Sequence, residues 1–186
     1  MKKTIVAVMV AASAVLSAQA FAAGNSANLT ILGKVTDANN SCDVTPAPLI
    51  AGGTLTLNDI KASVLQGANL NTPYQPLAKD IEYEIKDCTL GGAAYNGPLA
   101  ITVTGDHISS MTDVLTNTAS SPAQDSSVTV VNTNWSRVDL TGATAAQTIT
   151  YSGNPVWMRF KAAYVRTGGT VSEGNVKGVA TFTISY

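Results

Sequence analysis

Histidine, cysteine, aromatic residues and charged residues are all scarce in this chain of 186 residues. It has one His and two Cys, with 6% aromatic and 12% charged residues. The 11 basic and 12 acidic residues form no cluster, whereas binding to nucleic acid needs several basic contacts on one face. We therefore expect no nucleic-acid partner. The apolar content of 45% is enough to build a core, and the length favours one domain.

Catalytic side chains are equally few. His107 is the single histidine, so any Ser-His-Asp or Cys-His arrangement would have to use it, and no Gly-x-Ser-x-Gly motif is present. Glu82 and Glu84 lie two residues apart, which places them on the same face of a strand. Because they alternate with apolar residues, we interpret that face as solvated, and His107 as an exposed turn residue. No catalytic residue is assigned, and the protein is not expected to be an enzyme.

One segment begins like a calcium-binding loop. Residues 37–43 carry oxygen-bearing side chains at alternate positions. The segment lacks the glycine at its sixth position and has Pro48 where the bidentate Glu belongs. We therefore interpret it as a turn, and we expect neither a metal nor a cofactor.

The first 22 residues have the three parts of a secretory signal peptide. Lys2 and Lys3 form a basic start, residues 5–16 are apolar, and Ala20 and Ala22 provide a small-residue cleavage site. We place cleavage after Ala22, with Ala20 as the second candidate. Removal would leave nine basic and twelve acidic residues, a formal charge of −3. No later segment has 18 uncharged apolar residues, so we expect export without membrane insertion.

Export decides how the two cysteines are interpreted. In an oxidising compartment an even pair favours a disulfide, whereas a structural metal site needs four ligands. We therefore predict a bridge between Cys42 and Cys88. The alternative is two free, buried thiols.

The rest of the chain consists of short alternating segments. Residues 29–35 and 81–86 alternate apolar with polar or charged side chains, the pattern of half-buried strands. Two short segments, 60–65 and 111–115, are each predicted to form one helical turn. The predicted fold is a sandwich of two antiparallel sheets, with further strands expected at 54–57, 99–104, 127–131, 148–151, 156–165 and 176–186.

The two ends of the chain suggest assembly with other chains. Residues 23–28 are small and polar, and they precede the alternating strand at 29–35. At the other end Ala180, Phe182, Ile184 and Tyr186 alternate with Thr and Ser, so we expect a C-terminal strand with no polar tail. A strand at the edge of a sheet offers unpaired backbone groups to another chain.

Short motifs follow one another along nearly the whole mature chain. In order they are Ile-Leu-Gly-Lys-Val at 31–35, Ser-Cys-Asp-Val at 41–44, Lys-Asp-Cys at 86–88, Phe-Lys-Ala-Ala-Tyr at 160–164, Thr-Gly at 167–168, Gly174, and the closing run 180–186. Gly174 precedes Tyr186 by twelve residues. This ordered set resembles the pilin subunits of chaperone–usher fimbriae, close to the type 1 major subunits.

Two features depart from that family pattern. The family usually has one residue after the near-terminal tyrosine, whereas this chain stops at Tyr186. The interval between the cysteines is several residues longer than usual and contains Pro73 and Pro76, which suggests an enlarged surface loop.

The resemblance implies an all-β fold, an incomplete immunoglobulin-like antiparallel sandwich that is completed by a donated strand. Residues 23–37 would be the N-terminal extension that acts as donor strand, and 38–186 the pilin domain. The donor positions would be Leu29, Ile31, Gly33 and Val35. The acceptor groove and chaperone contact would involve Gly174, Phe182, Ile184 and Tyr186.

The function implied is that of a structural subunit of an extracellular fimbria that supports cell adhesion. The implied partners are identical or related pilin subunits, a periplasmic pilus chaperone and an outer-membrane usher. The implied route runs through the periplasm to the cell surface, with subunits joined by donor-strand exchange.

Three alternatives remain open from the sequence. Residues 29–35 could be an ordinary first strand of the chain's own closed sandwich, because alternation indicates half-burial without saying in whose core. The subunit could be a minor or adaptor pilin, or a small adhesin that binds glycans through loops holding Trp135 or Tyr95. A secreted hydrolase is the third, disfavoured by the lack of a nucleophile–base pair.

Overall fold

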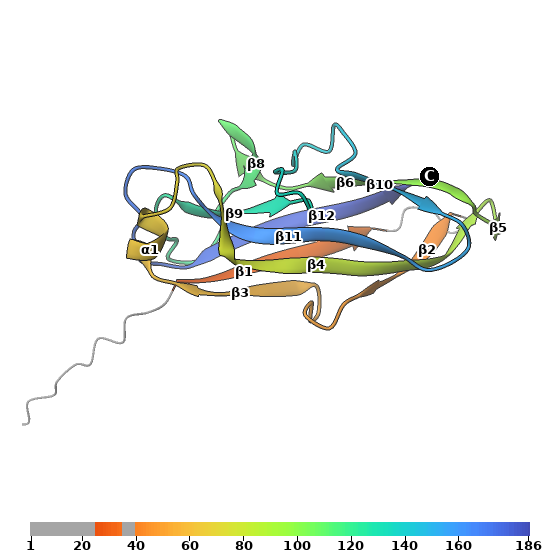
Figure 1. Ribbon diagram of the computed structural model, residues 1–186, viewed down its shortest axis with the longest axis horizontal. Helices are drawn as coiled ribbons and strands as arrows, with labels where there is room; N and C mark the ends of the chain where they lie inside the picture. Colours follow the sequence, from red (N-terminus) through yellow and green to blue (C-terminus); the bar gives the residue numbers. More distant parts are fainter. Residues whose placement is uncertain (1–24, 35–39) are drawn as a thin grey trace, which may run out of the picture.

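The protein is built almost entirely from β-strands that run along its long axis (Figure 1). The structure is a computed structural model, and it describes residues 25–34 and 40–186. The predicted signal peptide at 1–22 and the predicted donor residue Val35 lie outside the described residues. Helix α1 lies at one end of the molecule, and the C-terminus and β5 lie at the other (Figure 1). The predicted all-β sandwich is confirmed.

The first sheet has five strands and contains the N-terminal strand in its interior. Its order is β10 (Gln147–Tyr151), β6 (Gly97–Thr104), β12 (Val176–Ser185), β1 (Asn25–Lys34) and β3 (Thr54–Ile60). Strand β1 runs parallel to β12 and antiparallel to β3. The pairs β12–β6 and β6–β10 are antiparallel. The first sheet therefore joins the two ends of the described chain at its centre.

The second sheet is antiparallel throughout, and a disulfide joins two of its strands at one edge. Its order is β2 (Ser41–Pro46), β4 (Pro73–Leu90), β11 (Val156–Arg166) and β9 (Ser126–Val131), with β5 (Ala93–Ala94) paired to the end of β4. The predicted bridge is confirmed, since Cys42 of β2 is bonded to Cys88 of β4. Glu82 of β4 forms an ion pair with Arg159 of β11 at 3.1 Å, on the face interpreted above as solvated.

The core lies between the inner faces of the two sheets. On β6 the alternate residues Leu99, Ile101 and Val103 are fully buried. The rings of Phe160 on β11 and Phe182 on β12 meet across the core, 5.4 Å apart. Alternation with period two thus places one face of β6 inside, as the sequence predicted, whereas β9 is buried at all six positions.

Two of the local predictions concern short segments. The helical turn expected at 60–65 corresponds to α1 (Ala62–Gln66), which begins two residues later and ends one residue later. The turn expected at 111–115 is wrong, because this segment forms strand β8 (Met111–Leu115), which pairs with β7 (His107–Ile108). Five residues are too few to propagate a helix without tertiary support. The backbone of this segment instead forms hydrogen bonds to other segments. It pairs with β7, and the Thr112 carbonyl accepts from the Leu140 amide at 2.8 Å.

The enlarged loop suggested by Pro73 and Pro76 is a second wrong prediction. Both prolines belong to β4, an 18-residue strand. The pairing of β4 with β11 shifts by several residues between Ala162 and Tyr164, and Pro76 lies in the part of β4 that is extra. Proline is tolerated at such an irregularity because its missing N–H leaves no ladder bond unmade.

Candidate functional site

The candidate site is the position of β1 between two strands that are distant from it in sequence. Leu29 lies opposite Gly178 of β12 on one side and opposite Leu55 of β3 on the other. Both Leu29 and Leu55 are almost completely buried, with exposed fractions of 0% and 1%. The segment therefore completes the sheet of its own chain, which is the arrangement that the first alternative above describes.

Each predicted donor residue within β1 lies at an alternate position of the ladder. Leu29 is opposite Gly178, Ile31 is opposite Ala180, and Gly33 is opposite Phe182. Residues that alternate along a strand share a face, so these three positions belong to the face of β1 that holds the buried Leu29.

The predicted acceptor residues on β12 occupy different depths. Phe182 is 4% exposed and contacts Phe160, while Ile184 is only partly buried and lies opposite Ile101 of β6. Tyr186 is 38% exposed and lies at the disulfide end of the sandwich. Its hydroxyl is 3.3 Å from Cys42 Sγ, and its ring meets that of Tyr95 edge to face at 5.0 Å. The structure therefore brings Phe182 next to β1 and places Tyr186 at the end of β12.

Gly174 has a packing role in the loop that precedes β12. Its φ of +148° is one that L side chains rarely adopt. A Cβ at this position would lie 2.5 Å from the Ala123 amide nitrogen. The Asn175 carbonyl accepts from that same amide at 2.9 Å. The glycine thus permits the close approach of two backbones at the start of β12.

Two neighbours of β1 were missed by sequence reasoning. Strand β3 pairs with β1 on the side away from β12, although only a strand at 54–57 was predicted and no partner was assigned to it. Gly178 of β12 lies opposite Leu29, and a Cβ on Gly178 would lie 2.6 Å from Leu115 Cδ1. The alternation of Leu55 and Leu57 signals burial, but no local pattern indicates which distant strand lies alongside.

A tyrosine of the second sheet bonds to β3 and β1 of the first sheet. The Tyr164 hydroxyl donates to the Asn58 carbonyl of β3 at 3.1 Å. Burial raises the pKa of Tyr164 far above its usual value, the nearby Asp59 carboxylate adds to this, and a hydrogen bond with the Ala27 backbone acts in the opposite direction. Tyr164 therefore connects β11 with both β1 and β3 while staying protonated.

Two features are absent from the described residues, a cluster of metal-binding side chains and a helix that could span a membrane. In residues 25–34 and 40–186 no group of three His, Cys, Asp or Glu side chains could hold a metal ion. Within the same residues, no helix has the length and apolar character needed to cross a bilayer. Burial also raises the pKa of Tyr83 and, together with Tyr95, that of Tyr186.

Comparison with known proteins gives one family. A family model described as fimbrial protein matches residues 8–186. No curated protein sequence matches the chain.

Three solved structures of pilus or fimbrial proteins have a similar fold. The crystal structure of the P pilus rod subunit PapA is 18% identical, with a TM-score of 0.59 over 80% of this chain and 99% of that one. A chaperone–usher pilus structure, described as revealing the basis of rod uncoiling, is 20% identical, with a TM-score of 0.59 over 83% and 91%. The antigen and type I fimbria protein of Burkholderia pseudomallei is 15% identical, with a TM-score of 0.56 over 88% and 95%.

Proposed function

The chain belongs to the fimbrial protein family as a structural, non-enzymatic pilin subunit, and from this premise we propose that its subunits polymerise by donor-strand exchange. In this proposal residues 23–37 of one subunit complete the first sheet of its neighbour, whose pilin domain is 38–186. Leu29, Ile31, Gly33 and Val35 are the donor positions. Gly174, Phe182, Ile184 and Tyr186 belong to the acceptor and chaperone contact.

The observation that carries the proposal is the internal position of β1. Its described ladders join it to β12 and β3, which begin about 150 and 30 residues away from it in sequence. Without β1 these two strands would each present an open ladder, and the apolar inner surface around Leu55 and Phe182 would meet water. Such a groove accepts any strand with the same alternation.

Energetics support a stable joint between subunits. Full burial of a Leu or Ile side chain contributes roughly 1.5–3 kcal/mol, and β1 adds a ladder of eight residue pairs with β12. A strand supplied by a neighbour would offer the same side chains and the same backbone groups. No nucleotide is needed to drive that step.

The chain's own β1 competes for the groove. A tethered segment acts at an effective concentration in the millimolar range for short linkers, well above that of free subunits. Assembly therefore requires that the groove be kept occupied by something else until a neighbour's segment arrives. A periplasmic chaperone that lends a strand, with delivery to an outer-membrane usher, meets this requirement. The assembled fimbria would then extend from the cell surface and support adhesion.

Deletion of residues 23–36 tests the donor assignment. Co-expressed with its chaperone, the deleted subunit should fold but be unable to complete a neighbour. On a denaturing gel run without boiling, the full chain should give a ladder of multimers and the deletion variant only a monomer band. A ladder from the deletion variant would show that the donor assignment is wrong.

A peptide and a further variant separate loss of assembly from a simple folding defect. A synthetic peptide of residues 23–36 should restore a folded, monomeric state to the purified deletion variant, since it fills the empty groove in trans. Gly33→Leu should block the ladder while leaving export to the periplasm intact, because Gly33 lies opposite Phe182. If Gly33→Leu assembles normally, the groove does not require a small residue there.

A further inference from the structure

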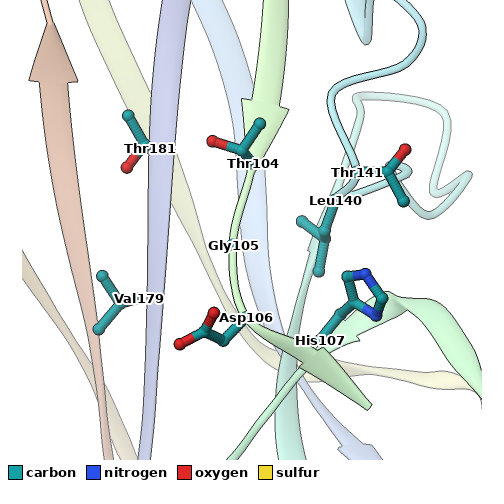
Figure 2. Close-up of a pocket in the computed structure, with 8 residues that line it drawn as sticks. All are labelled: Thr104, Gly105, Asp106, His107, Leu140, Thr141, Val179 and Thr181. Atoms are coloured by element: carbon teal, nitrogen blue, oxygen red, sulfur yellow. The ribbon is translucent and has the colours of Figure 1, made fainter. Parts of the chain in front are cut away.

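A pocket of about 550 Å³ lies on the outer face of the first sheet, on the side away from the core. Its floor includes Thr104 of β6 and Thr181 of β12, which lie opposite each other in the ladder. Figure 2 shows these two threonines beside each other, with Leu140, Thr141 and His107 on the opposite wall. The volume falls in the range of about 300–1,000 Å³ that is usual for small-molecule sites.

The walls of the pocket are held in place by backbone contacts. The Gly105 amide donates to the Leu140 carbonyl at 3.1 Å, and a Cβ on Gly105 would lie 2.6 Å from the Val179 carbonyl oxygen. In the opposite wall, Asp139 accepts from the Thr141 hydroxyl at 2.6 Å and from its amide at 3.2 Å. These bonds lower the pKa of Asp139, which stays ionised. The pocket is therefore formed before any ligand arrives.

Several polar groups around the pocket keep their hydrogen-bonding capacity. Within the described part of the chain, the Asp106 carboxylate and the hydroxyls of Thr104 and Thr181 have no side-chain partner. His107 Nδ1 lies 3.3 Å from the Ile108 carbonyl. Because a carbonyl only accepts, this contact favours the proton on Nδ1 and leaves Nε2 as an acceptor.

The charge and shape of the lining restrict the class of ligand. None of the eight described residues that line the pocket is Lys or Arg, so phosphates and sulfates find no cationic partner. A single lining carboxylate is too few for a divalent cation, which prefers several oxygen ligands. Val179, which is partly exposed, adds a small apolar surface between the hydroxyls and the carboxylate. This combination matches a ring with one apolar face and several hydroxyl groups.

We propose that this pocket binds the terminal ring of a neutral saccharide, with Asp106 and His107 Nε2 accepting from ring hydroxyls. The Thr104 and Thr181 hydroxyls bond the same ring from the sheet, and its apolar face lies against Val179. The pocket uses the outer face of the first sheet, whereas the proposed donor groove uses the inner face. Saccharide binding is therefore independent of donor-strand exchange.

The test is a titration of the folded, isotope-labelled subunit, followed by the NMR shifts of its amides. The probes are the methyl glycosides of glucose, galactose, mannose and N-acetylglucosamine, together with lactose. At least one probe should give saturable shifts confined to residues 104–107 and 140–142. Asp106→Asn should weaken that binding about tenfold, because bonds to charged groups are the strongest available. The matched control is Asp43→Asn, an exposed carboxylate on the second sheet, which should bind as the unchanged chain does.

The outcomes separate the saccharide site from the polymer. No saturable shift with any probe, or binding that Asp106→Asn leaves unchanged while its spectrum is that of a folded chain, would overturn the proposal. Asp106→Asn should still give the ladder of multimers, so loss of binding with an intact ladder isolates the pocket. Competition with oligosaccharides from host glycoproteins and from bacterial surface polysaccharides then identifies the source, and binding of either supports the site.

Discussion

The two sheets of this pilin are completed in different ways. In the second sheet, β2 and β4 are joined by the Cys42–Cys88 bond, and β11 pairs with neighbours on both sides. In the first sheet the interior strand β1 is attached to β12 and β3 by hydrogen bonds and apolar contacts. The second sheet thus contains a covalent link, whereas β1 is held in the first sheet by non-covalent contacts.

The outer faces of the two sheets differ as well. The second sheet carries cross-strand ion pairs, Arg159 with Glu82 and Lys161 with Asp80, and these cations lie over the rings of Trp157 and Trp135 respectively. The first sheet carries uncharged cross-strand pairs instead, Thr181 with Thr104 and Thr183 with Thr102. Charge therefore contributes to the surface of the second sheet, while β1 is held in the first sheet by apolar burial and backbone bonding.

The largest effect on folding is expected from removal of the disulfide. Cys42→Ala combined with Cys88→Ala should lower the free energy of unfolding by about 4 kcal/mol, because the bond closes a loop with a sequence separation of 46. Urea denaturation followed by circular dichroism measures this loss. Once folded, the double variant should still form the ladder of multimers. Equal stability of the two proteins would mean that the second sheet is not held by its covalent link.

A smaller loss is expected from Leu29→Ala, at about 3 kcal/mol, through the lost burial and the cavity left behind. Ile81→Ala is the matched control in the second sheet, since both side chains are fully buried. Both variants should destabilise the subunit to a similar degree. Only Leu29→Ala should also weaken the ladder of multimers. Equal ladders from both variants would count against the proposal that β1 joins one subunit to the next.

Tyr164→Phe should cost about 1 kcal/mol at neutral pH, because it removes the hydrogen bond from β11 to the Asn58 carbonyl of β3. The pKa of Tyr164 is raised in the folded state, so above about pH 10 the unfolded chain releases its proton first. Stability conferred by the neutral hydroxyl is then lost as pH rises. Urea midpoints between pH 8 and pH 11 should fall less steeply for the Phe variant, and parallel profiles would refute the assignment.

The smallest effect is expected from Glu82→Gln, which removes the ion pair with Arg159. The two side chains are 37% and 53% exposed, so the loss should stay below about 0.5 kcal/mol. Thermal unfolding at low salt and in 1 M NaCl measures it, and the difference should vanish in salt. A loss of several kcal/mol would mean that surface charge, rather than the disulfide, holds the second sheet.

Most of the strands could be predicted because their side chains alternate strictly. Segments such as 99–104 and 148–151 were predicted within two residues of β6 and β10. The prediction of a helical turn at 111–115 failed because the segment is short and has no strong hydrophobic periodicity. Its strand structure depends on pairing with β7. The prediction of a loop around Pro73 and Pro76 failed because β4 tolerates proline where its pairing with β11 is irregular, and that irregularity is not visible in the sequence.

Sequence alone determined the fold class, the disulfide and the alternating character of residues 29–35, because each depends on residue type, spacing or compartment. Only the tertiary structure decided that β1 lies between β12 and β3, that Gly178 lies opposite Leu29, and that Asp106 and His107 share a pocket with Thr104 and Thr181. These juxtapositions join residues that are far apart along the chain. Alternation reports that one face of a strand is buried, but the partner that buries it is selected by packing and hydrogen bonding across the whole sheet.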